Sequence, residues 1–79
     1  MADRAEIKRS VTIAGHRTSV ALERDFWEAL REISSAQGLS QSALIAMIDA
    51  ERIDGETGLN LSRAIRVYVL NYYRSAARR

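Results

Sequence analysis

Residues 16–45, HRTSVALERDFWEALREISSAQGLSQSALI, decide the fold because an alternating pattern changes there into a helical one. In the first part Thr18, Val20 and Leu22 share one side of an extended segment. From Phe26 onward the apolar residues recur at helical spacing. A strand and two short helices cannot bury their apolar faces alone. We therefore expect half of a dimer core, formed by Val20, Leu22, Phe26, Leu30, Ile33, Leu44, Ile45 and Ile48.

A second alternating segment, KRSVTI, precedes this stretch and predicts a β-hairpin over residues 8–22. Only Ala14 and Gly15 separate the two segments, which favours a two-residue loop. An even loop places Val11 and Ile13 on the face of Val20 and Leu22, and leaves the opposite face polar.

Residues that cap or stop helices set the other predicted boundaries. Gly38 is placed to end the first helix and Ser40 to cap the second. Trp27 lies beside the apolar stripe of the first helix, and we expect it to pack inward. The sequence predicts one mainly helical domain over residues 1–79, with a frayed segment over 1–7 and helices over 24–37, 41–53 and 61–77, the last capped by Asn60 or Ser62.

The order of these elements resembles the ribbon-helix-helix family of small bacterial DNA-binding proteins, to which the MetJ and Arc repressors belong. The strand RTSVAL, the helix RDFWEALREISSAQ and the step GLSQSALI follow one another without gaps. The resemblance implies a homodimer that binds double-stranded DNA and regulates transcription, with one strand of a two-stranded ribbon from each chain. It implies base contacts by the outward residues Arg17, Ser19 and Ala21, and phosphate contacts at the second helix by Ser40, Gln41 and Ser42.

The residue types and charges suit such roles. Arg17 can donate a fork to guanine O6 and N7, Ser19 can contact several bases, and Ala21 offers only a methyl group. The net charge is +2, yet residues 57–79 hold five arginines and no acid, residues 1–22 are net positive, and the middle is net negative. A polyanion would meet the ends of the chain, where Lys8 and Arg9 are further candidates for phosphate contacts. The alternative is that these charges only solvate the surface.

The composition argues against several other classes of protein. There is no cysteine and one histidine, His16, so we expect no disulfide, no metal site, no cofactor and no catalytic residue. The acids Asp49, Glu51, Asp54 and Glu56 lack the ligand spacing of an EF-hand and are expected to form a solvated loop. The apolar runs are too short for a membrane span. We expect a cytoplasmic protein that is not an enzyme.

Two alternatives remain. If residues 8–13 pair with the ribbon strand, the dimer sheet has four strands and is too wide to enter a major groove flat. Three outcomes are then open. The added strand frays when DNA binds, it follows phosphates with Lys8 and Arg9, or the chain is a dimeric protein-interaction module, antitoxin-like or adaptor-like, that binds a protein partner through its sheet or its third helix. The segment around Gly38 also fits a helix-turn-helix, although few polar residues of its second helix could reach bases.

Overall fold

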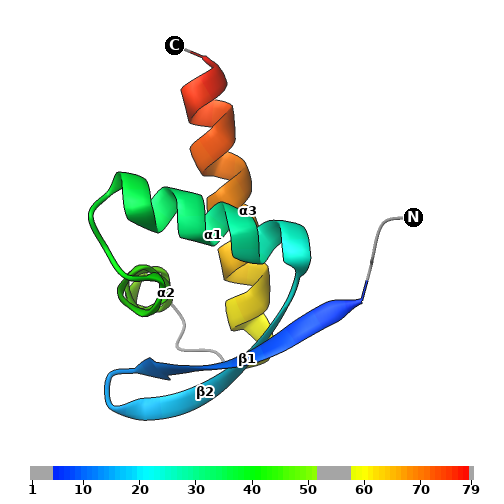
Figure 1. Ribbon diagram of the computed structural model, residues 1–79, viewed down its shortest axis with the longest axis vertical. Coiled ribbons are helices and arrows are strands. Elements are labelled where there is room, and N and C mark those ends of the chain that lie inside the picture. Colours follow the sequence, from blue (N-terminus) through cyan, green and yellow to red (C-terminus); the bar gives the residue numbers. More distant parts are fainter. Residues whose placement is uncertain (1–4, 52–57, 79) are drawn as a thin grey trace.

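The computed structural model describes residues 5–51 and 58–78, which form a two-stranded sheet and three helices (Figure 1). The predicted hairpin followed by three helices is confirmed. The elements are β1 (Glu6–Ile13), β2 (His16–Glu23), α1 (Arg24–Ala36), α2 (Gln41–Ala50) and α3 (Gly58–Ala77). Figure 1 shows the hairpin along one side of the molecule, with α1 crossing α3 above it.

The hairpin has the expected two-residue loop, in which Ala14 and Gly15 have φ angles of 51° and 83°. Two positive φ values are typical of a type I′ turn, whose twist matches that of the flanking strands. Ile13 pairs with His16 and Val11 with Thr18, so the predicted grouping of the faces is confirmed. The strand begins earlier than expected, and the prediction of a frayed segment was wrong for Glu6 and Ile7. Glu6 pairs with Glu23, and the Ile7 carbonyl accepts a hydrogen bond of 2.8 Å from the Trp27 indole N–H.

The stripe that α1 buries keeps the predicted Leu30 and Ile33 but contains Trp27 in place of Phe26. Trp27 is 3% exposed and lies in the core with Leu30 and Ile33, whereas Phe26 is only half-buried. The prediction that Trp27 packs inward is confirmed. The prediction that Phe26 is buried with Leu30 and Ile33 was wrong, because the indole N–H of Trp27 reaches β1 and holds that face of α1 against the hairpin.

The turn between α1 and α2 has the predicted caps. Gly38 has a φ of 71°, and the Leu39 N–H donates to the Ser34 carbonyl at 2.8 Å, as in a Schellman motif. The Ser40 hydroxyl accepts from the Ala43 N–H at 3.0 Å and caps α2. α2 ends at Ala50, whereas the sequence predicted an end at residue 53. Residues 52 and 53 lie outside the described part of the chain.

α3 completes the core within one chain. Leu61, Ile65 and Val69 are buried against the hairpin and the other two helices. Seven of the eight residues predicted for a dimer core are thereby already buried, and Phe26 is the exception. The expectation that the apolar faces need a second chain overlooked this cover. The role of these residues in a dimer core stays a prediction.

The start of α3 also differs from the expected one. The described part of the helix starts at Gly58, before the expected residue 61, so positions 60 and 62 lie within it. The Ser62 hydroxyl instead donates to the Ala21 carbonyl of β2 at 3.0 Å. Arg66, one turn further on, donates to Glu23 at 3.1 Å and to Glu6 at 2.9 Å. These contacts fix α3 to the hairpin.

Candidate nucleic-acid interface

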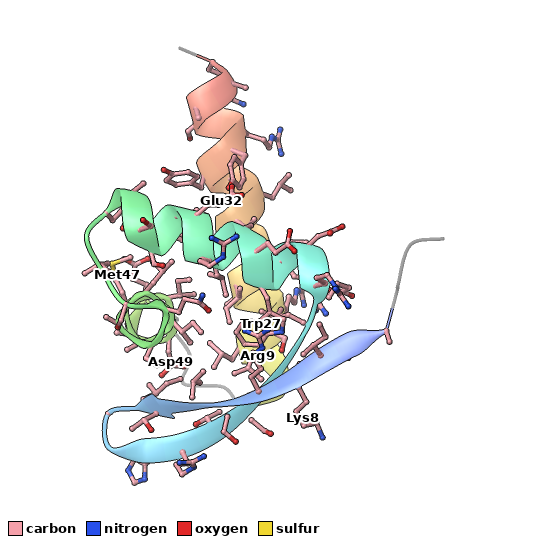
Figure 2. The ribbon with its side chains drawn as sticks, viewed as in Figure 1. Lys8, Arg9, Trp27, Glu32, Met47 and Asp49 are labelled. Carbon is pink, nitrogen blue, oxygen red and sulfur yellow. The ribbon has the colours of Figure 1, made fainter. Side chains whose placement is uncertain are left out.

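The outer face of the hairpin brings the predicted base-contact residues together. Lys8 pairs with Ala21, Ser10 with Ser19, and Thr12 with Arg17. All of these side chains are exposed except Ala21, which is half-buried. Figure 2 shows Lys8 pointing away from the helices. The result is a continuous polar face on which Arg17 and Lys8 supply the cations and Ser10, Thr12 and Ser19 supply hydroxyl groups.

Both strands of this ribbon come from one chain, whereas the sequence resemblance implied one strand from each of two chains. Adjacent strands lie about 4.8 Å apart, and a major groove about 12 Å wide admits a two-stranded ribbon. The hairpin of a single chain therefore has the width for groove entry. The four-stranded sheet considered from the sequence would arise only if a second copy paired along an open edge.

α3 covers part of the outer edge of β2, where such pairing would occur. In a two-residue hairpin the pair next to the loop, here Ile13 and His16, is hydrogen-bonded, and hydrogen-bonded and non-hydrogen-bonded pairs then alternate along the strands. Lys8 and Ala21 form a non-hydrogen-bonded pair, so the N–H and C=O of Ala21 point away from β1. Its carbonyl is the one that accepts from Ser62. A partner strand would have to displace this contact.

The predicted phosphate contacts fall into two places. Ser40, Gln41 and Ser42 lie at the N-terminus of α2, where the helix dipole attracts anions. Lys8 is on the outer face of the hairpin, but alternation along β1 places Arg9 on the opposite face. The Arg9 guanidinium lies 4.9 Å from the centre of the Trp27 ring, and Figure 2 shows the two side chains together.

Arg9 and Gln41 meet in an open pocket of about 430 Å³ between β1, α1 and α2. Two further arginines of α1, Arg24 and Arg31, also line it, and sequence reasoning missed both as candidates because the middle of the chain is acidic overall. The remaining lining residues are Ile7, Trp27 and Glu28. The spacing 24, 27, 28 and 31 is a helical stripe, and this signal could have grouped the two arginines with Trp27.

Two carboxylates and one arginine lie at the end of the ribbon near α1. Glu6 and Glu23 face each other on the outer face, where two like charges repel. Arg66 contacts both carboxylates, and its guanidinium lies 5.9 Å from the centre of the Phe26 ring. The pKa of Glu23 is lowered from its ordinary value, first by a hydrogen bond from its own backbone N–H and then by the Arg66 side chain. Glu23 is therefore ionised and paired at neutral pH.

Other kinds of site have little support in the described ranges, 5–51 and 58–78. There, no three metal-binding side chains come together, and no helix is long and apolar enough to span a membrane. His16 is exposed next to the turn and pairs with Ile13. Of the four acids predicted to form a solvated loop, Asp49 lies in α2, so the prediction was wrong for it, and Glu51 is the C-cap of that helix. Asp54 and Glu56 lie outside these ranges.

Comparison with known proteins identifies the fold. The sequence pattern of the ribbon-helix-helix domain matches residues 6–73, most of the chain. The solved structure of an uncharacterized protein from Bordetella pertussis Tohama I superposes with a TM-score of 0.80 at 32% sequence identity. This match covers 95% of the present chain and 61% of the Bordetella protein. No curated protein matches. Ribbon-helix-helix domains form a DNA-binding family, not an enzyme family, and generally act as dimers. With its hairpin, its helical turn at Gly38 and this match, the chain belongs to the ribbon-helix-helix domain family.

Proposed function

We propose that this protein is a homodimeric transcriptional regulator that places the outer face of its hairpin in the major groove of DNA. The observation that carries the proposal is the exposed polar face of a ribbon two strands wide. The other side of the hairpin packs on the core through Ile13, Val20 and Leu22, which leaves this face to a partner. The ribbon-helix-helix family, whose domains bind DNA, supports the same assignment.

The proposed contacts follow from the side chains on that face. Arg17 donates a fork to guanine, Ser19 exchanges a hydrogen bond with a base edge, and the Ala21 methyl group contacts thymine. Lys8 and the first turn of α2, with Ser40, Gln41 and Ser42, contact phosphates. Arg9 contacts a phosphate from the pocket described above.

The second copy is proposed to pack on an apolar groove between α1 and α3. The groove has a volume of about 370 Å³ and is lined by Phe26, Arg66, Val67, Val69, Leu70 and Tyr73. Val67 is 49% exposed, Leu70 53% and Tyr73 40%, which is unusual for large side chains so close together on one helix. Phe26 also lines this groove. Of the eight residues predicted for the dimer core, it is the one whose side chain is only half-buried.

Charge supports a second copy as the occupant. α3 carries Arg63, Arg66 and Arg74 and no acid, whereas α1 is net negative, with Asp25, Glu28 and Glu32 against Arg24 and Arg31. A two-fold dimer that sets α3 of one chain beside α1 of the other would therefore pair opposite charges at the rim. The alternative, strand pairing along β2, would have to displace Ser62 from the Ala21 carbonyl.

Selection from a random duplex library followed by sequencing tests the DNA-binding role. We expect enrichment of a short motif. Arg17→Ala should weaken binding to that motif by about 1–3 kcal/mol and relax the preference at one base position. Arg78→Ala removes the same charge from the exposed end of α3 and serves as the matched control. Equal losses in both variants would mean that Arg17 acts only through its charge.

A protein-interaction module is the second candidate, because the groove on α3 would also suit a different protein. In that case the library would yield no enriched motif. Enrichment of a motif by a dimer would exclude this candidate.

A further inference from the structure

We propose that the arginine pocket between β1, α1 and α2 binds a phosphoryl group. The pocket is defined by Arg9, Arg24, Arg31, Glu28 and Gln41 around Trp27 and Ile7. The phosphoryl group is supplied either by a duplex backbone or by a free phosphate compound. Only the duplex source rests on the proposed DNA-binding function.

The charges around the pocket favour an anion. Arg9 and Arg31 bring two guanidinium groups to its lining, against one carboxylate, that of Glu28, among the lining residues in the described part of the chain; Arg24 also lines it. Arg9 comes from β1, whereas Arg24 and Arg31 lie on one side of α1, about two turns apart. The cations therefore line the opening from two elements. Guanidinium forks match the geometry of phosphate oxygens and remain charged at any physiological pH.

The pocket is also partly preorganised. The Arg9 guanidinium lies over the Trp27 ring at 4.9 Å, a cation–π distance. Trp27 is itself fixed, because its ring is buried and its indole N–H donates to the Ile7 carbonyl at 2.8 Å. An anion that binds here therefore meets one cation already held in place, which lowers the entropy cost of binding.

The fourth side of the pocket belongs to α2. Gln41 is the first residue of this helix, and Ser40 caps it. The positive end of the helix dipole thus adds to the three arginines. It plays a supporting part, and the arginine cluster carries the proposal.

Trp27 provides the measurement, because it is the only tryptophan of the chain and forms the floor of the pocket. Sodium phosphate is titrated at constant ionic strength, with chloride as the balancing anion, while the tryptophan fluorescence is recorded. We expect a saturable change with phosphate. Loss of one charge-assisted hydrogen bond in Arg31→Ala should weaken binding about tenfold. Glu28→Gln should strengthen binding severalfold, because it removes a carboxylate that repels the anion.

Arg78→Ala is the control for net charge and should leave the titration unchanged. Arg31 and Glu28 are exposed, so both variants are expected to fold, and circular dichroism checks this. A change of opposite sign in the two variants would not arise from a general loss of structure.

A second arm identifies the source of the phosphoryl group. The salt dependence of duplex binding is measured for the unaltered chain and for Arg31→Ala. A slope lower by about one in the variant identifies a backbone phosphate. A saturable phosphate titration that Arg31→Ala weakens, with an unchanged duplex slope, identifies a free phosphate compound. The proposal is wrong if neither measurement responds to Arg31→Ala. Failure of the library selection alone would reject the DNA-binding function and leave the phosphate titration as an independent result.

Discussion

A single aspartate in the apolar groove is expected to separate the proposed dimer into folded monomers. Leu70 is 53% exposed and contributes nothing to the buried core, so Leu70→Asp should not unfold the chain. If the groove holds a second copy, the same substitution places two carboxylates in the interface. The variant therefore tests the interface and not the fold.

The expected magnitude follows from the exposure of Leu70. Full burial of a leucine side chain is worth about 1.5–3 kcal/mol, so covering the exposed half recovers about 1 kcal/mol in each chain. Burying a polar group without a partner costs at least about 1–3 kcal/mol per copy. Over the two copies the loss is about 4 kcal/mol or more, which raises the dimer dissociation constant about a thousandfold.

Sedimentation velocity over a range of concentrations measures this change, and thermal unfolding followed by circular dichroism confirms that the monomer is folded. Asn71→Asp introduces the same charge at the neighbouring exposed position of α3, outside the lining of the groove, and should leave the dimer intact. Ser19→Pro tests the other possible interface. The Ser19 peptide faces the outer edge of β2, so proline there removes a donor that a partner strand would need.

A dimer lost in Ser19→Pro but retained in Leu70→Asp would refute the groove and establish pairing along β2. A dimer lost in both would mean that the hairpin and the groove act together. If the groove is the whole interface, the dimer should be lost in Leu70→Asp and retained in Ser19→Pro.

Three further predictions concern stability. The pKa of Glu23 is lowered below its ordinary value of 4.5, so its ionised form stabilises the fold above that pH. This contribution to the free energy of unfolding, measured in urea, should fall as the pH decreases from 4.5 through the folded-state pKa. Glu23→Gln should remove this part of the pH dependence. Trp27→Phe should cost about 1–2 kcal/mol in the same assay, because it removes the hydrogen bond to Ile7 and weakens the contact with Arg9, and an unchanged value would show that neither matters. Ile65→Ala should cost about 2–5 kcal/mol at protein concentrations at which the chain is monomeric, and a much smaller loss would contradict the core that α3 completes within one chain.

Local rules predicted the parts of the fold that depend on neighbouring residues. The loop of Ala14 and Gly15 fixed the parity of the strands, and Gly38 and Ser40 fixed the turn between two helices. Such features depend on backbone conformation and hydrogen bonds within a few residues, so the residue types at neighbouring positions are enough to predict them. The polar face of Arg17 and Ser19 followed from the same alternation.

The parts that sequence reasoning missed depend on which elements pack together. Phe26 and Trp27 lie on adjacent positions of an amphipathic helix, and only the contact of the indole with β1 decides which of them is buried. The cover that α3 provides depends on the path of the chain after α2. Arg9 is a different case, because alternation along β1 already places it on the face of Val11 and Ile13. Its charge alone had grouped it with Lys8 as a candidate for phosphate contacts.

The origin of the ribbon within one chain changes what a dimer would do on DNA. With one strand from each chain, a dimer has a single ribbon and a single groove contact. Here each chain has a complete ribbon, so a dimer joined through α3 has two of them. Two ribbons related by a two-fold axis would read two inverted half-sites, and contact with the same side of the duplex requires a separation of about 10 base pairs or a multiple of it. The motif obtained from the random library should therefore be palindromic with a fixed spacer, and Leu70→Asp should reduce it to one half-site. An uninterrupted motif that persists in this variant would mean that one chain binds DNA alone.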